Sequence, residues 1–261
     1  MPPATQKVTL HALRQMKREH RKIVAVGLYD FQMAQIVDRS GVDIVSVGDS
    51  VGPNMWGLAS EHDVTLEQML LVCTAVGRGV TRALVSCDFP GRVFDEGVDA
   101  VIRAARRLVD EGGADVVKVD GLADSPEVVE ALAQAGVPVF AQLGPSTRLK
   151  PDTTTLDVER WVAAAKRLES AGAVMLNFTH SGPVAGPAVV QAVSIPVLGG
   201  LGGGPWLDGR NRVIGNAIGY LARALDDDVE RYANVARITS DAIAEYADDV
   251  RGGRQVKGEP T

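Results

Sequence analysis

The stretch Gly41-Val-Asp-Ile-Val-Ser-Val-Gly-Asp-Ser50 contains the pattern that decides the fold. Its first glycine follows a segment with helical character, as expected where a helix ends. The apolar run Ile44–Val47 then predicts a buried strand, which ends in a polar turn with Asp49 and Ser50. The segment Gly112-Gly-Ala-Asp-Val-Val-Lys-Val-Asp-Gly121 has the same order. Strands that are apolar on both faces and alternate with helices indicate a parallel sheet covered by those helices.

The same alternation runs along the whole chain. We expect strands at residues 22–26, 44–47, 83–86, 116–119, 137–142, 173–177 and 195–198, with a short eighth at 213–214. We expect helices at residues 31–40, 66–78, 97–111, 126–135, 156–170, 187–193, 215–225 and 229–250, and a long loop at 48–63. So many strand–helix units in one chain predict a single-domain (β/α)8 TIM barrel with a C-terminal helix. The domain is expected to span residues 1–250, followed by a disordered tail at 251–261.

Charge and composition exclude several classes of protein. The chain of 261 residues carries a net charge of -6, which argues against a nucleic-acid partner because phosphate backbones require a basic surface. No apolar run reaches the roughly 20 residues that span a bilayer, and the N-terminal region lacks the apolar core of a signal peptide. Cys73 and Cys87 form no CxxC pair, so we expect buried free thiols rather than a zinc site or a disulfide. A cytoplasmic protein without a membrane partner is therefore expected.

The reactive groups of a (β/α)8 enzyme lie where each strand ends and its loop begins. Asp49, Asp88 and Asp120 follow three adjacent predicted strands, with Lys118 beside them. Carboxylate oxygens, completed by water and substrate oxygens, are the ligands that Mg2+ prefers. A metal chelated by the carboxylate and keto oxygens of a 2-oxo acid would stabilise the enolate formed when a proton leaves the next carbon. The sequence thus predicts a metal site at these three aspartates and an anion-binding role for Lys118.

Other polar residues follow the later strands: Gln142, Asn177, Thr179, His180 and the glycine run Gly199–Gly204, which includes Gly202. Backbone N–H groups without side chains can bind an anion, and barrel phosphate sites often follow the seventh and eighth strands. Simpler interpretations remain open. A lone aspartate after a strand is often a helix N-cap, Lys118 could be a surface or ion-paired residue, the glycines could form a flexible turn, and His180 could be structural.

Taken together, these residues resemble a known family over about residues 8–220. The resemblance is carried by Tyr29-Asp30, the stretch Gly41–Ser50, Val64-Thr-Leu-Glu67, Ala75-Val76, Arg78-Gly79, Asp88-Phe-Pro90, the segment Gly112–Gly121, Gln142-Leu-Gly144, Ile195-Pro-Val-Leu198 and Asp208-Gly209. They are similar to ketopantoate hydroxymethyltransferases, of the phosphoenolpyruvate mutase/isocitrate lyase superfamily of barrels. The turn Val-Gly-Asp-Ser, with the downstream aspartate and Lys-x-acid motif, is fairly specific.

The resemblance implies an activity and a set of roles. The enzymes of this family add a hydroxymethyl group from methylenetetrahydrofolate to 3-methyl-2-oxobutanoate, with Mg2+ as the metal. It implies that Asp49 and Asp88 hold the metal, with Asp120 in place of the family's metal-linked glutamate. It also implies that Ser50 and Lys118 hold the carboxylate of the oxo acid. Family members form homo-oligomers, and the apolar positions of the helix at 229–250 offer either an interface or a cover for the barrel's own end.

The sequence departs from the family's pattern at three places. Thr179 stands where the family has its catalytic glutamate base, so His180, one residue later, is the remaining candidate base. Gln142 stands where the family has histidine, and the connection at residues 145–155 is shorter. These departures weaken the prediction of folate and of this particular oxo acid together.

Three functions remain open from the sequence. The first is a hydroxymethyltransferase-like enzyme that acts on a 2-oxo acid, with catalytic roles for His180, Thr179 and Lys118. The second is a related metal-dependent C–C lyase or aldolase that acts on a different oxo acid without folate. The third is a barrel that has lost catalysis and serves as a binding subunit. In the enzymatic cases we expect the substrate to contact Ser50, Asp49, Asp88, Lys118, Gln142 and Gly202.

Overall fold

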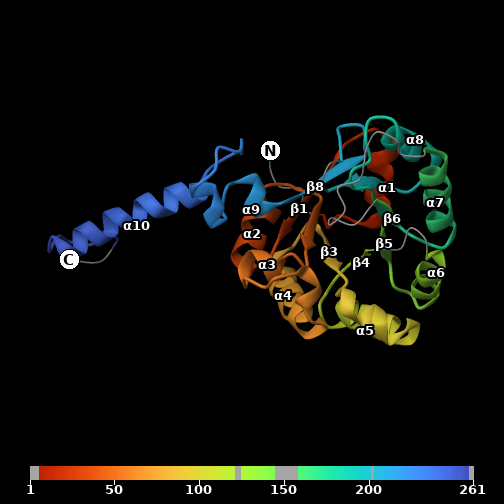
Figure 1. Cartoon of the computed structure of the whole chain (residues 1–261), viewed down its shortest axis with the longest axis horizontal. Coiled ribbons are helices and arrows are strands. Elements are labelled where there is room, and N and C mark those ends of the chain that lie inside the picture. Colours follow the sequence, from red (N-terminus) through yellow and green to blue (C-terminus); the bar gives the residue numbers. More distant parts are fainter. Residues whose placement is uncertain (1–5, 121–124, 145–157, 201–202, 259–261) are drawn as a thin grey trace. The chain divides into compact units, whose positions relative to one another are not determined.

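The parallel strands that the sequence predicts close into a barrel. The structure, a computed structural model, describes residues 6–120, 125–144, 158–200 and 203–258. By internal contacts the chain divides into two compact units, Met1–Arg212 and Val213–Thr261, and each is described by itself. The strands are β1 (Ile23–Leu28), β2 (Ile44–Val47), β3 (Leu84–Asp88), β4 (Val116–Val119), β5 (Val139–Gln142), β6 (Met175–Asn177), β7 (Val197–Gly199) and β8 (Gly209–Val213). They pair in sequence order, all in parallel, which confirms the predicted (β/α)8 barrel (Figure 1).

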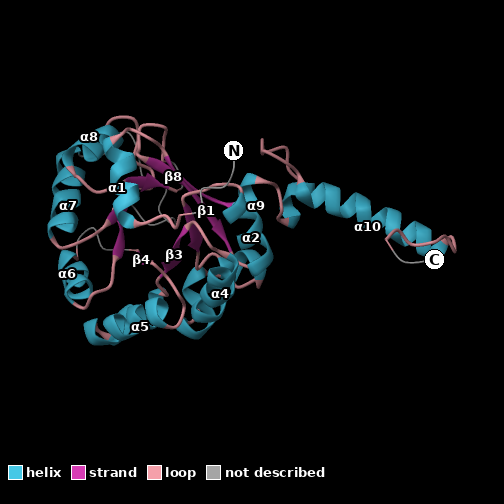
Figure 2. Cartoon of the chain, turned by 180° about the vertical axis from the view of Figure 1, so that it is seen from behind, coloured by secondary structure: helices cyan, strands magenta, loops and turns pink. Residues whose placement is uncertain are grey.

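Helices cover the outside of these strands (Figure 2). They are α2 (Phe31–Arg39), α4 (Leu66–Gly79), α5 (Val98–Asp110), α6 (Pro126–Gln134), α7 (Val158–Ser170) and α8 (Ala185–Ala192). The start of α4 shows why the sequence folds in this way: Thr65 and Gln68 form a capping box that satisfies otherwise unpaired N–H groups of the first turn. The loop expected at 48–63 contains two short helices, α3 (Val51–Met55) and η1 (Glu61–Asp63), and η2 (Gly91–Glu96) follows β3.

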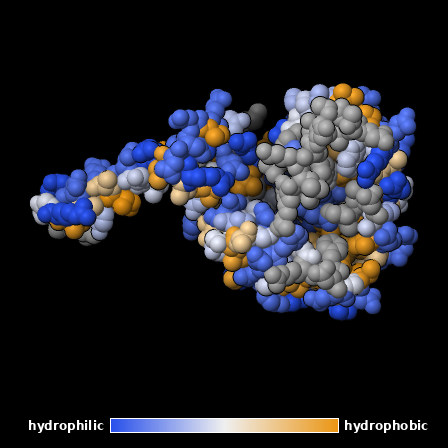
Figure 3. All heavy atoms as spheres, in the orientation of Figure 1, coloured by the Kyte–Doolittle hydropathy of each residue, from blue (hydrophilic) through white to orange (hydrophobic). Residues whose placement is uncertain are grey.

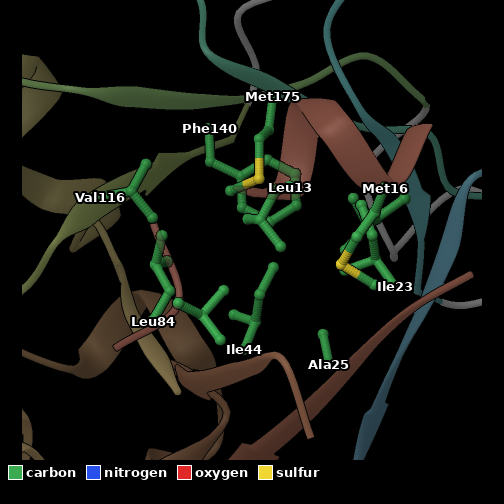
Figure 4. Close-up of a cluster of buried hydrophobic side chains, with 11 residues drawn as sticks. Leu13, Met16, Ile23, Ala25, Ile44, Leu84, Val116, Phe140 and Met175 are labelled. Atoms are coloured by element: carbon green, nitrogen blue, oxygen red, sulfur yellow. The ribbon is translucent and has the colours of Figure 1, made fainter. Parts of the chain in front are cut away.

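A helix that the sequence did not predict closes the amino-terminal end of the barrel. Helix α1 (Leu10–Arg18) places Leu13 and Met16 in a buried cluster with residues from the beginnings of the strands. Figure 4 shows Leu13 close to Phe140 and Met175 at the centre of this cluster. Each such buried apolar side chain stabilises the fold by about 1.5–3 kcal/mol. The polar residues predicted for the site lie at the opposite, carboxyl-terminal end of the strands.

Aspartates fix the beginnings of several strands. Asp43, Asp115 and Asp208 precede β2, β4 and β8, and each accepts a backbone N–H from a neighbouring strand, at Val24, Val85 and Val197, over 2.7–2.9 Å. Two of these carboxylates also form ion pairs, Asp115 with Lys7 and Asp208 with Lys17, both at 2.8 Å. These contacts fix the register at the closed end of the barrel.

The structure corrects the sequence prediction near the end of the barrel. Strand β8 lies at Gly209–Val213, not at 213–214, because its alternating exposed arginines hide the apolar pattern of a barrel strand. The helix expected at 215–225 is wrong as a single element: α9 (Ile214–Ala217) and η5 (Ala222–Leu225) are separated by Gly219, whose φ of +63° no regular helix contains.

The second unit ends in α10 (Val235–Arg251), a helix with no buried residue. Ile238, Ile243, Tyr246 and Val250 are exposed on it. The chain beyond α10, where a disordered tail was expected, forms ion pairs from Arg254 to Asp249 and from Lys257 to Glu245. Among the described residues, no helix is both long and apolar enough to cross a membrane.

Candidate functional site

A charged centre lies at the carboxyl-terminal ends of β3 and β4. The register pairs Asp88 with Lys118, so both side chains point the same way. The ammonium of the buried Lys118 donates to Asp88 Oδ2 at 3.1 Å and to Asp120 Oδ1 at 2.8 Å. Burial favours the neutral amine, but the carboxylates of Asp120, Asp88 and Asp49 outweigh it and raise the pKa of Lys118. Lys118 therefore stays a cation at the floor of the site.

Two carboxylates of this centre, Asp49 and Asp88, are buried and have raised pKa values. Burial, with the charge of Asp88 second, raises the pKa of Asp49 to about 7. Burial also raises the pKa of Asp88 to about 6, against the lowering effect of Lys118. The second oxygen of Asp88, Oδ1, is buried and has no hydrogen-bond partner in the structure. An oxygen in that position, beside a second buried carboxylate, is suited to a hard cation such as Mg2+.

The structure brings the predicted metal residues together only in part. Within the described residues, no three histidine, cysteine, aspartate or glutamate side chains form a cluster ready to hold a metal. The Lys118 ammonium lies between Asp88 and Asp120 instead, and Asp120 is largely exposed. Asp49 and Asp88 are the pair whose chemistry fits a cation, while Asp120 acts in this geometry as the partner of Lys118.

Ser50 belongs to a second group of polar residues, beside the charged centre. Its Oγ lies 2.8 Å from the hydroxyl of Tyr29, which also receives a 3.0 Å hydrogen bond from Asn54 Nδ2. A Cβ on Gly48 would lie 2.8 Å from Ser50 Oγ and 3.7 Å from Asp88 Oδ2, so the serine hydroxyl folds back over this glycine on the side of Asp88. The sequence predicted Ser50 but gave Tyr29 and Asn54 no role, although Tyr29 directly follows β1 as the other site residues follow their strands.

On β5 and β6 the polar side chains are neutral. Asn177 Oδ1 accepts from the backbone N–H of Gly200 at 3.2 Å, and Asn177 Nδ2 donates to Gln142 Oε1 at 2.5 Å. Gln142 Nε2 in turn donates to Thr179 Oγ1 at 2.9 Å. All three side chains are buried. The two residues that depart from the family's pattern, Gln142 and Thr179, thus contact each other in one hydrogen-bonded chain.

His180 adopts an unusual backbone conformation beside this chain. Its φ is +50°, one of two positive values outside glycine in the described residues. Such a conformation costs about 1–2 kcal/mol and is often found near functional sites. His180 is half-buried, directly after the buried Thr179. Its role as a base stays a prediction, and the predicted residue Gly202 and the segment 145–157 lie outside the described residues.

The sequence matches a protein family along nearly its whole length. The family described as ketopantoate hydroxymethyltransferase matches residues 7–255. Proteins named 3-methyl-2-oxobutanoate hydroxymethyltransferase are similar to the chain. Those of Staphylothermus marinus (32% identity; 95% of this chain, 93% of that protein), Hyperthermus butylicus (35%; 95% and 88%) and Rippkaea orientalis (33%; 94% and 98%) are examples.

Solved structures of other enzymes share the fold. The chain is similar to 2,3-dimethylmalate lyase, of the PEP mutase/isocitrate lyase superfamily, with a TM-score of 0.62, 17% identity and coverage of 96% of this chain and 91% of that one. It is also similar to phosphonopyruvate hydrolase in complex with oxalate and Mg2+, with a TM-score of 0.62, 14% identity and coverage of 94% and 88%. At these identities the likeness concerns the barrel alone.

Proposed function

The chain belongs to the ketopantoate hydroxymethyltransferase family, and from this premise we propose that it transfers a one-carbon group to a 2-oxo acid with the help of Mg2+. The observation that carries the proposal is the buried pair Asp49 and Asp88, with Asp88 Oδ1 lacking a partner. Lys118 balances one of these two buried carboxylates, and the second is costly in the interior without a further cation. Asp49 and Asp88 would hold the metal, with Asp120 able to join them.

Residues around this pair supply binding and orientation. When bound, the metal acts as a Lewis acid toward the keto oxygen. Lys118, buried and positively charged, offers a charge-assisted hydrogen bond to the carboxylate of the oxo acid. Ser50, on the same side as Asp88, offers its hydroxyl to that carboxylate. Asp49, Asp88 and Lys118 match the family's pattern, which supports an enzyme rather than an inactive binding subunit.

The neutral, hydrogen-bonded side chains at the ends of β5 and β6 favour a second candidate function. Gln142, Asn177 and Thr179 carry no group that accepts a proton near neutral pH. A reaction that starts by removing a proton from C3 of the oxo acid needs such a group, which leaves His180. A metal-dependent C–C lyase or aldolase on a different 2-oxo acid, without folate, makes a smaller demand on this part of the site if its substrate or a bound water supplies the base.

Deuterium exchange separates these functions. The protein is incubated with Mg2+ and 3-methyl-2-oxobutanoate in D2O, and exchange at C3 is followed by NMR. Exchange without folate supports the transferase, whereas exchange only with other 2-oxo acids supports the lyase or aldolase. The absence of exchange with any 2-oxo acid, with the protein folded, contradicts both.

Asp88→Ala tests the metal site directly. We expect this change to abolish Mg2+-dependent activity and oxo acid binding together, because it removes a buried carboxylate that holds Lys118 at 3.1 Å and carries the unpaired oxygen proposed to bind the metal. The matched control is Asp99→Ala, since Asp99 is exposed on α5. Calorimetric titration measures both affinities, and a variant that kept full metal-dependent activity would place the site elsewhere.

We further propose a homo-oligomer in the cytoplasm. Helix α10 has no buried residue, and Figure 3 shows apolar side chains at its surface among hydrophilic ones; Ile238, Ile243, Tyr246 and Val250 are the exposed apolar residues. A second copy of the chain that packs on this face would bury them. Light scattering after size exclusion tests this, with Ile243→Glu expected to weaken the assembly; a monomeric wild-type protein contradicts it. The free, buried Cys73 and Cys87 are in keeping with a reducing compartment.

A further inference from the structure

The hydroxyl of Ser50 contacts Tyr29, which in turn accepts a hydrogen bond from Asn54, and both residues lie outside the charged centre. We propose that Tyr29, supported by Asn54, is a positioning residue that directs the proton of the Ser50 hydroxyl toward the carboxylate of the bound oxo acid. The inference rests on the proposed function, in which Ser50 binds that carboxylate. It adds the reason why a serine hydroxyl, which rotates freely in water, donates in one direction here.

Ser50 does not cap the helix that it precedes. It occupies the N-cap position of α3, where a serine usually accepts a hydrogen bond from the backbone of the first helical turn. In this structure its side chain makes no capping hydrogen bond. The hydroxyl instead turns back over Gly48, toward the side of Asp88, and meets Tyr29 at 2.8 Å. Ser50 therefore serves the site rather than the helix.

Asn54 fixes the direction of the hydrogen bonds at Tyr29 and Ser50. Asn54 contributes an amide N–H, which can only donate, to the oxygen of Tyr29. The proton of the buried Tyr29 hydroxyl then needs an acceptor. Within the part of the chain that the structure describes, Ser50 Oγ is the one acceptor in contact with it. Tyr29 thus donates to Ser50, and Ser50 keeps its own proton for another oxygen.

The phenol of Tyr29 remains a donor at neutral pH. Tyr29 is 8% exposed, and burial raises its pKa above 10.0, with smaller contributions in the same direction from the charges of Asp88 and Asp49. The chain of donors from Asn54 through Tyr29 to Ser50 consequently points at the place where the negative charge of the substrate arrives. Donors arranged in advance in this way avoid a reorganisation cost on binding.

The test is a double-mutant cycle read out by binding. Calorimetry measures the affinity for oxalate, a stable analogue with two carboxylates, in the presence of saturating Mg2+. We expect Tyr29→Phe, which keeps the buried ring, to weaken oxalate binding about five- to tenfold, the range of one neutral hydrogen bond. In a Ser50→Ala background the same change is expected to have less than a twofold effect. Tyr232→Phe, at an exposed tyrosine of the second unit, is the matched control.

Asn54→Asp tests the direction independently. A carboxylate can only accept, so Tyr29 would donate to residue 54 and Ser50 would have to donate to Tyr29. We expect Asn54→Asp to weaken oxalate binding more than Asn54→Ala does, with Mg2+ affinity unchanged in Asn54→Ala.

The outcomes distinguish a failure of the proposed role of Ser50 from a failure of the proposed role of Tyr29. If Ser50→Ala alone leaves oxalate binding unchanged, the role of Ser50 in the proposed function is wrong, and the inference is overturned with it. If Ser50→Ala weakens binding but Tyr29→Phe adds its full effect in that background, only the inference is overturned. Melting temperatures within a few degrees of wild type show that each variant is folded.

Discussion

Lys118 is the residue on which the charges of the site converge. Its ammonium contacts Asp88 and Asp120, and its side chain is only 8% exposed. Breaking a buried ion pair by removing one partner leaves an uncompensated charge, which typically costs about 3–5 kcal/mol. The residue that we propose to bind a substrate anion therefore also stabilises the folded protein.

Lys118→Met should therefore have two measurable effects. We expect the free energy of unfolding at pH 7 to fall by about 3 kcal/mol, because Asp88 loses its counter-ion. We expect oxalate affinity in the presence of Mg2+ to fall at least about a hundredfold, since charged hydrogen bonds contribute more than neutral ones. Urea unfolding and calorimetry measure these quantities. Lys166→Met, on the outer helix α7, is the control, and equal stability of the two variants would contradict the prediction.

At the scale of elements, carboxylates at the closed end tie the helices and loops to the strands. Asp38, near the end of α2, accepts hydrogen bonds from the backbone N–H groups of Thr81, Arg82 and Ala83 and from the Thr81 hydroxyl, over 2.7–3.2 Å. Burial alone would raise its pKa, but these hydrogen bonds outweigh burial, so the pKa of Asp38 is lowered from 3.8. One carboxylate thus anchors the loop that enters β3.

Asp38→Asn should show this anchor in a pH-dependent way. Because the folded-state pKa is lowered, the carboxylate stabilises the fold above its ordinary pKa near 3.8, and this contribution is lost as the pH falls through the lowered value. We expect the variant to be less stable than wild type by about 1.5–3 kcal/mol at pH 7. This difference in the free energy of unfolding between variant and wild type should become smaller as the pH falls below about 4. Urea unfolding at several pH values measures the difference. If the difference stayed the same at low pH, packing and not the charge of Asp38 would be its cause. Asp99→Asn is the control.

At the scale of the whole molecule, the two ends of the barrel do different work. The buried cluster around α1 stabilises the closed end, and the proposed site lies at the carboxyl ends of the strands. Leu13→Ala is expected to lower the free energy of unfolding by about 2–5 kcal/mol, because it removes a fully buried side chain. The turnover number of the folded variant should match wild type within about twofold, as α1 touches no site residue named above. A lower turnover number at 15 °C, where the variant is folded, would contradict the view that the two ends of the barrel act independently.

The sequence predicted most of the barrel and only part of the site. Strands such as β2 and β4 were placed correctly because their apolar runs are bounded by glycines and polar turns. Strand β8 was missed because its sequence, Gly-Arg-Asn-Arg-Val, is mostly polar, and tertiary packing there overrides local propensity. Helix α1 was missed although Leu10, Leu13 and Met16 recur at helical spacing behind the N-cap Thr9, since the polar and basic residues between them mask that pattern.

The sequence predicted which residues belong to the site but not which of their side chains meet. Strand ends indicated Asp49, Asp88 and Lys118 from their position alone. The contact between Gln142 and Thr179, and that of Tyr29 with Ser50, joins residues far apart in the chain, and no local pattern reports which side chains meet across a barrel. Sequence spacing also could not show that Lys118 lies between two of the three predicted metal ligands.

The plug formed by α1 also bears on the order of events during turnover. Leu13, Phe140 and Met175 fill the amino-terminal end of the barrel, so reactants approach the proposed site from the carboxyl-terminal end. If both reactants of the proposed transfer use that route, a small acid bound near Asp88 has to arrive before a larger reactant that covers it. We therefore expect steady-state kinetics with an obligatory order of binding, and a random order would contradict this expectation.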